Sequence, residues 1–230
     1  MSADLHQNPG SGPVLQLLSR GLQLWLRSQC EAIDTLELEL LGSGRELLRG
    51  RLAGVRVRAR GVTYRQLTMA AVELTSTPLE LSMAPLWRGR TPVLQQPFRI
   101  AGTAHFDSAG LNRSLAGEPW RQLGDQLIRE LLQGAERQSA PPQAVQLQQI
   151  RLEGQQLTLI AAAAPSEPPA EPAVTEVPVQ LQLEASCLRF RRNDGPGQGS
   201  LPLDPSLRIE AATVIDGTLL LAGEAAVTPG

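Results

Sequence analysis

The sequence contains no lysine and few of the residues that usually carry chemistry. All 21 basic residues among its 230 are arginine, and the chain has two histidines, two cysteines, three tryptophans, three phenylalanines and one tyrosine. Cys30 and Cys187 lie far apart and outside any CxxC pair, so the sequence offers neither a disulfide framework nor a thiolate metal site.

Catalytic and nucleotide-binding motifs are missing as well. No GxSxG elbow, P-loop, HExxH helix or calcium-binding loop occurs. His105 shares strand parity with Asp107, but no nucleophile accompanies the pair, so we interpret His105 as an ordinary residue of a solvent-facing surface. The sequence therefore predicts no enzyme, no cofactor and no metal ion.

Targeting and membrane-spanning segments are also absent from the pattern. Residues 1–12 are polar, without a cationic region followed by an apolar run, and predict a disordered tail rather than a signal peptide. No stretch of about 18 uncharged apolar residues occurs, which predicts no transmembrane helix. The default expectation is a cytoplasmic protein that associates peripherally with a membrane.

The hydrophobic pattern predicts a single α+β domain over residues 13–230. Amphipathic helices begin at Pro13, running to about Ile33, and at Pro119, with a shorter helix capped by Asp107. Alternation predicts strands at 35–42, 55–62, 64–83 with a break near Pro78, 98–106, 145–152, 157–161, 177–187, 207–215 and 219–227. Because most strands have one apolar and one polar face, we predict a long bent antiparallel sheet partly wrapped around the helices.

Two loops interrupt this pattern. Residues 165–176 are rich in proline and acidic side chains and predict a loop inserted into the domain. The segment NDGPGQGS, residues 193–200, predicts a second loop, and Asp216 with Gly217 predicts the turn of a closing hairpin.

One predicted strand carries arginine on alternate positions. Arg56, Arg58 and Arg60 fall in the window 45–65, which holds seven arginines and one glutamate, Glu46. One interpretation is the polar face of an edge strand, paired with Glu37 and Glu39 on the neighbouring strand. The other is attraction to the anionic headgroups of a membrane.

Nucleic acid is the less favoured partner for this window. Proteins that bind single strands combine basic residues with aromatic stacking platforms, and Tyr64 is the one aromatic residue among these arginines. We therefore expect no nucleic-acid partner.

The two long helices have apolar arcs that fit either a closed core or a groove for an apolar ligand. The first arc is about 200° wide, broader than packing on a sheet requires, and Trp25 lies near its centre, where we expect the deepest burial. The candidate groove residues are Leu18, Leu22, Trp25, Leu26, Trp120 and Leu127.

Three blocks resemble a known family in order along the chain. The block LELELLGSGRELLRGRLAGVRVRARGVTYRQLTMAAVELTSTPLEL, the block FRIAGTAHFDSAGLNRSLAG and the closing LRIEAATVIDGTLLLAGEAAVTPG are similar to the LmeA-like phospholipid-binding family. None of the three contains a catalytic motif, and together they cover most of the chain after residue 13.

The resemblance implies phospholipid binding without catalysis, at a membrane surface, in lipid handling or envelope maintenance. It also implies a sheet curled around helices, similar to tubular lipid-binding folds, and it supplies no residue-level site and no protein partner. The alternative is a protein-interaction scaffold with a closed core and no lipid ligand.

Overall fold

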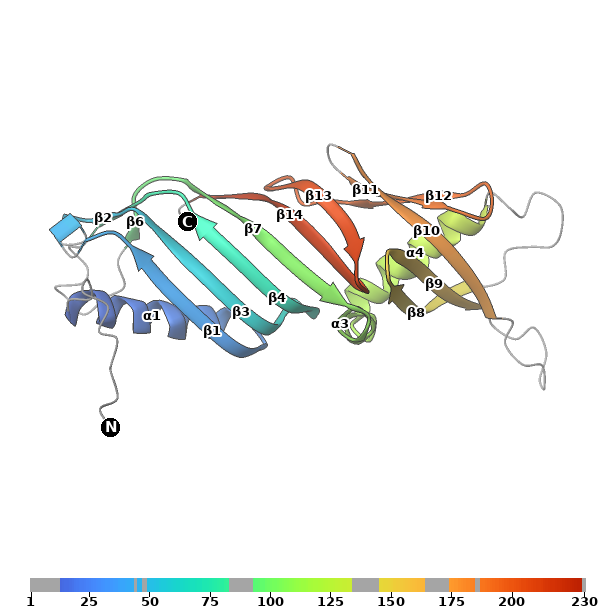
Figure 1. Cartoon of the computed structure of the whole chain (residues 1–230), viewed down its shortest axis with the longest axis horizontal. Helices are drawn as coiled ribbons and strands as arrows, with labels where there is room; N and C mark the ends of the chain where they lie inside the picture. The colour runs from blue at the N-terminus through green and yellow to red at the C-terminus, as the bar shows by residue number, and fades with distance from the viewer. Residues whose placement is uncertain are drawn as a thin grey trace.

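The structure is a computed structural model that describes residues 13–43, 45–46, 49–82, 93–133, 145–163, 174–184 and 187–228. The predicted tail 1–12 lies outside the described residues, as do positions 165–173 of the predicted loop. Val174 already belongs to a strand, so the loop is shorter than predicted at its end. Figure 1 shows an elongated molecule with helix α1 at one end and α4 towards the other.

Within the described ranges, the strands form three antiparallel sheets. The six-stranded sheet has the order β1 (Ala32–Leu41), β3 (Gly54–Tyr64), β4 (Leu67–Ser76), β7 (Phe98–Asp107), β14 (Thr218–Val227) and β13 (Leu207–Ile215). The five-stranded sheet has the order β12 (Gln198–Pro202), β11 (Cys187–Arg192), β10 (Val174–Glu184), β9 (Gln156–Ala163) and β8 (Val145–Glu153). A small third sheet joins β2 (Arg51–Leu52), β5 (Leu79–Ser82) and β6 (Val93–Leu94).

The α+β class with antiparallel strands is confirmed, whereas the prediction of one long sheet is wrong. Alternation identifies strands but not their partners, and the chain leaves the six-stranded sheet after β7 and returns to it only with β13. The predicted strand 177–187 is two strands, because β10 ends at Glu184 and β11 begins at Cys187. The likeness to tubular lipid-binding folds stays a prediction.

In the described part of the chain, helices α1 (Pro13–Gln29), α3 (Ser108–Ser114) and α4 (Glu118–Gln133) accompany the sheets. Helix α1 ends earlier than predicted, since β1 already starts at Ala32. Asp107 caps α3 as expected, its carboxylate accepting a hydrogen bond from the backbone of Gly110 at 2.6 Å. The closing hairpin is also confirmed, with Asp216 and Gly217 at φ of 49° and 71°.

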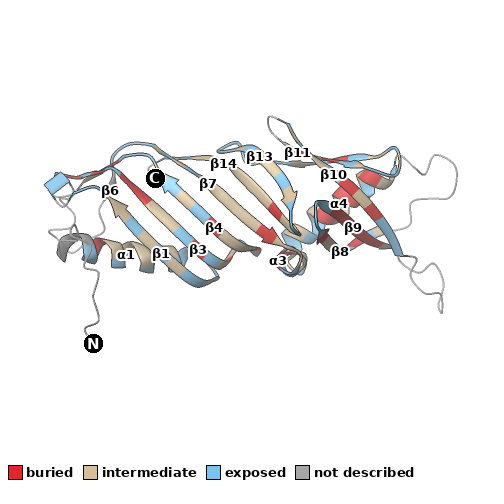
Figure 2. Ribbon diagram, viewed as in Figure 1, coloured by how far each residue is buried: buried red, intermediate tan, exposed pale blue. Residues whose placement is uncertain are grey.

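Helix α4 and the five-stranded sheet enclose the main core. Ile128 and Leu131 on α4 have no exposed surface, and they share a cluster with Leu159 of β9 and Val177 of β10. Figure 2 shows buried residues concentrated at this end of the molecule. This half of the structure is therefore a closed, packed core.

Short helix α3 joins the two larger sheets. The side-chain amide of Asn112 donates to the carbonyl of Ile150 in β8 at 2.9 Å, and its oxygen accepts from the Ile150 amide at 2.7 Å. On the other side, the hydroxyl of Ser114 accepts a hydrogen bond from the amide of Thr68 in β4 at 2.9 Å. These bonds satisfy polar groups of both sheets and hold α3 between them.

A kink at Gly61 ends the regular alternation of β3. Arg60 is exposed and Val62 is buried although they are two residues apart, which a regular strand does not allow. Gly61 has φ of 58°, a conformation that glycine adopts without strain. The kink lies beside Ala71 of β4, where the sequence pattern slips to the other parity.

Gly61 and Gly154 offer a matched test of this kink, because their φ values are 58° and 57°. An added Cβ at Gly154 meets no atom within 4 Å, whereas at Gly61 it collides with the carboxylate of Asp34. We expect Gly154→Ala to lower the free energy of unfolding by about 1 kcal/mol and Gly61→Ala by about 2–4 kcal/mol. Urea unfolding measures the free energy of unfolding of both variants. If both lose the same amount, the Asp34 carboxylate moves aside without a cost in free energy.

Candidate functional site

The six-stranded sheet has one aliphatic face that is only partly covered. Residues paired in register lie on the same face, and two neighbouring rows cross all six strands. The first row contains Leu36, Ala59, Val72, Ala104, Leu221 and Ala212, and the second contains Leu38, Val57, Leu74, Gly102, Gly223 and Ile209. We call these two rows the apolar face. Ala59 and Val72 are buried, and the other members keep part of their surface exposed.

The described helices cover only part of this face: α1 packs at its β1–β3 side, and α3 packs where β4 begins and β7 ends. Leu18 and Leu22 of α1 pack with Leu38 and Val57 at the β1–β3 side. At the far side Leu221 and Ala212 border the core under α4. Figure 2 shows partial burial along the strands between these two ends. Six strands at a spacing of about 4.8 Å make this face about 24 Å wide.

A groove continues the apolar face at the junction of the two larger sheets. It lies between β13 and strands β9 and β10 and has a volume of about 850 Å³. Ala212, the last residue of the first row, lines it together with Val214, and Leu157 and Leu181 line it from the five-stranded sheet. Its polar lining includes Gln155, Gln156, Gln180, Asn193 and Thr213. Sequence reasoning missed this groove, because no local pattern shows that β13 faces β10.

The predicted groove residues do not converge on one site. In α1, Leu18 is buried and Leu22 and Leu26 are half-buried, whereas Trp25 is 55% exposed, so the prediction that Trp25 lies deepest is wrong. Helical spacing does place Trp25 on the same stripe as Leu18 and Leu22, at i, i+4 and i+7. Exposure increases along that stripe because α1 is less covered towards its C-terminal end.

The other two candidates lie on α4, away from α1. Trp120, at the start of α4, is half-buried and donates its indole N–H to the carbonyl of Arg65 at 2.9 Å. Leu127 is buried in the core that α4 forms with the five-stranded sheet. Both residues connect α4 to its neighbours, and neither belongs to the apolar face.

The arginine row lies on the other face of the same sheet. β3 pairs with β1 and with β4, so the interpretation of an edge strand is wrong. The expected pairing occurs for Glu39, whose Oε2 lies 3.1 Å from Arg56 Nη1. Glu37 stands in register with Arg58, but the Arg58 Nε instead lies 3.9 Å from Oε2 of Glu73 on β4. Arg60 is exposed and stands opposite Thr35 and Ala71.

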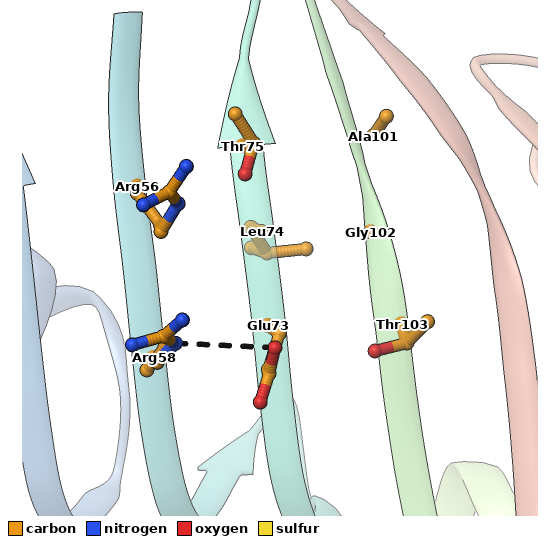
Figure 3. A pocket seen from close by; sticks show the side chains of 8 residues that line it. All are labelled: Arg56, Arg58, Glu73, Leu74, Thr75, Ala101, Gly102 and Thr103. Atoms are coloured by element: carbon orange, nitrogen blue, oxygen red, sulfur yellow. Dashed lines mark ion pairs between the residues drawn. The ribbon is translucent and has the colours of Figure 1, made fainter. Parts of the chain in front are cut away.

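Two of these arginines line a small pocket on the polar face. The pocket has a volume of about 200 Å³ and lies above Ala101 and Gly102 of β7, where one residue has only a methyl group and the other has no side chain. Figure 3 shows Arg56 and Arg58 on one side, Thr103 on the other, and the ion pair of Arg58 with Glu73 at its edge. Guanidinium and hydroxyl groups suit an anion, but Glu73 already occupies part of this space.

Titratable chemistry is sparse in the part of the chain that the structure describes. Burial, and then the neighbouring Glu31, raise the pKa of the Cys30 thiol, which disfavours the reactive thiolate. Among the described residues, no three histidine, cysteine or acidic side chains lie close enough together to hold a metal ion. The helices within the described ranges are too short or too polar to cross a bilayer.

The fold and this surface together define a class. An open antiparallel sheet that leaves an aliphatic face half exposed, next to a groove lined by both apolar and polar side chains, is suited to binding apolar or amphipathic ligands. The chain belongs to the LmeA-like phospholipid-binding family, whose model matches residues 10–224. No curated protein and no solved structure matches it. The resemblance found in the sequence is thereby confirmed.

Proposed function

We propose that this protein binds phospholipid without catalysis and handles it at a membrane surface, with the acyl chains lying along the apolar face. The observation that carries the proposal is the pair of aliphatic rows that cross six strands while most of their members stay half exposed. An aliphatic surface of this extent is unfavourable in water and becomes favourable when a ligand covers it.

The energetics support acyl chains as the ligand. Each methylene group that leaves water contributes about 0.8 kcal/mol, so a chain that covers several strands gains enough to offset the entropy lost on binding. The groove beyond β13 extends the same surface, and the amides of Gln155, Gln180 and Asn193 at its rim offer hydrogen bonds to a polar group. An amphipathic ligand matches this combination.

Headgroup recognition by Arg56, Arg58 and Arg60 stays a prediction. These arginines and the apolar face lie on opposite sides of one sheet, so a lipid whose chains lie on the apolar face does not reach them through the sheet. Any contact they make with anionic headgroups is therefore a separate contact with a membrane surface.

Lipid analysis of the purified protein tests the proposal. The protein is purified without detergent, its ligands are extracted into organic solvent, and phospholipid is quantified by mass spectrometry against an unrelated protein purified in parallel. We expect phospholipid in near-stoichiometric amount with this chain and a trace with the control. Equal traces in both, and no uptake of added phospholipid, would favour the scaffold with a closed core.

A further inference from the structure

The outward face of α1 carries an exposed apolar pair between two arginines. Arg20, Leu24 and Arg27 follow one another at i, i+4 and i+7 and share one stripe of the helix. Leu24 is 70% exposed, and Trp25 beside it is 55% exposed. Large apolar side chains at such exposure, next to cations, are typical of helices that lie in a membrane interface.

The charge of this face is positive. The α1 sequence contains two arginines and no acidic residue. Arg27 donates a hydrogen bond to the carbonyl of Ile33 at 3.0 Å, which leaves its charge uncompensated. The carboxylate of Glu31, just after the helix, accepts from the amide of Gln66 at 3.1 and 3.2 Å, so it is held at the turn between β3 and β4.

Further arginines lie at the same end of the molecule. Leu52 of β2 shares a buried cluster with Leu18 of α1, and Figure 1 shows β2 and α1 at the same end of the molecule. Arg49 and Arg51 next to Leu52 are exposed, and the nearest carboxylate oxygen of Glu80 is 4.0 Å from the Arg51 Nε. Arg45 is exposed as well, and the nearby acidic residues are Glu80 and Glu46, the second of which interacts with Arg49. Three arginines against two glutamates leave this end with a small positive charge.

We propose that α1 docks the protein on an anionic bilayer, with Leu24 and Trp25 inserted at the headgroup level and Arg20 and Arg27 among the anionic groups. Tryptophan favours this interface because its ring is apolar and its N–H stays hydrated. Each arginine near an anionic surface strengthens binding by roughly fivefold at physiological salt. The inference rests on the proposed role at a membrane surface and adds the face that makes the contact.

Docking through α1 also connects the bilayer with the apolar face. Trp25 is the exposed end of the stripe whose buried end, Leu18, packs at the β1–β3 side of that face. The arginine row is less suited to this contact, because Glu37, Glu39 and Glu73 flank its arginines in register and balance their charge. Helix α1, rather than the arginine row, therefore has the net positive charge that attracts an anionic bilayer.

Vesicle flotation tests the proposal with the full chain. Vesicles of phosphatidylcholine alone are compared with vesicles of phosphatidylcholine and phosphatidylglycerol in equal parts. We expect the protein to float with the anionic vesicles and salt to weaken this, since exposed charges are screened within about 8 Å at physiological ionic strength. Replacing Arg20→Gln together with Leu24→Ser should reduce binding about tenfold or more.

Two controls separate α1 from other surfaces. Val174→Ser removes an apolar side chain of similar exposure, 64%, in β10, and should leave flotation unchanged. Arg56→Gln with Arg58→Gln should change it by less than about threefold, as expected for a charge-balanced face. Loss of flotation in the Arg56 and Arg58 variant, with binding retained in the Arg20 and Leu24 variant, would overturn docking through α1.

A second measurement distinguishes docking on a bilayer from the binding of individual phospholipid molecules. In the absence of vesicles, a dispersed fluorescent phospholipid should bind the Arg20 and Leu24 variant as it binds the wild type, because both residues point away from the sheet side of α1. Retained flotation of that variant would overturn the docking proposal alone. Failure of the wild type to bind the dispersed lipid would instead overturn the proposed function.

Discussion

Replacing Leu131 with alanine is expected to lower the free energy of unfolding by about 2–5 kcal/mol. Leu131 has no exposed surface and lies with Ile128 in the core between α4 and the five-stranded sheet. The loop after β11 approaches so closely that a Cβ at Gly197 would meet the backbone of Leu131. The residues around Leu131 are packed against the helix, the sheet and this loop, so they cannot move into the cavity that the shorter side chain leaves.

Leu132 supplies the control on the same helix. It is half-buried at the margin of the same cluster, so Leu132→Ala should cost clearly less, about 1–2 kcal/mol. Guanidinium unfolding at equilibrium measures both variants. Equal losses, or a loss below about 1 kcal/mol for Leu131→Ala, would show that this end is not the packed core described.

Below its melting temperature, Leu131→Ala should bind phospholipid within about twofold of the wild type, since distant sites act nearly independently. That result would show that the stability of the core under α4 and phospholipid binding on the apolar face can change separately. The five-stranded sheet with α4 supplies a closed core, and the six-stranded sheet supplies the open apolar face.

Much of the local structure could be predicted from the sequence because local interactions determine it. The strict alternation in residues 35–42 and 55–62 predicts strands, and the structure has β1 and β3 there. Asp107 and the pair Asp216–Gly217 define a helix cap and a hairpin turn through their own backbone preferences.

The arrangement of these elements could not be predicted, because it depends on contacts between distant segments. The split into separate sheets depends on α3, where Asn112 and Ser114 bond to strands far from them in sequence. A helical wheel assigns Trp25 to the buried arc, but burial also depends on how far the sheet extends beneath the helix. The sequence did predict that the arginines and the apolar face lie on opposite sides of β3, because Val55 and Val57 alternate with the arginines along the strand.

Replacing Leu221 with asparagine is expected to weaken phospholipid binding about tenfold or more. Leu221 lies in the first row of the apolar face, between Ala104 and Ala212. Losing its contact with an acyl chain costs about half of the 1.5–3 kcal/mol that full leucine burial contributes, and covering an amide without a hydrogen bond costs more. Every 1.4 kcal/mol corresponds to a tenfold change in affinity.

The residue before it provides a matched control. Leu220 is also half-buried and lies on the same strand, but it pairs with His105 and Thr213 and belongs to the polar face. Leu220→Asn therefore changes the same chemistry at almost the same place in the fold without touching the apolar face. Because Leu221 also packs against the margin of the main core and Leu220 does not, the melting temperature of each variant is measured first, and the affinities are compared at a temperature at which both variants are folded.

The dissociation constants of these two variants for a dispersed fluorescent phospholipid, titrated side by side with the wild type, test the apolar face most directly. We expect Leu220→Asn to match the wild type within about twofold and Leu221→Asn to bind about tenfold or more weakly. Equal affinities for the two folded variants would contradict the account, since they would show that the acyl chains do not lie on this face of the six-stranded sheet.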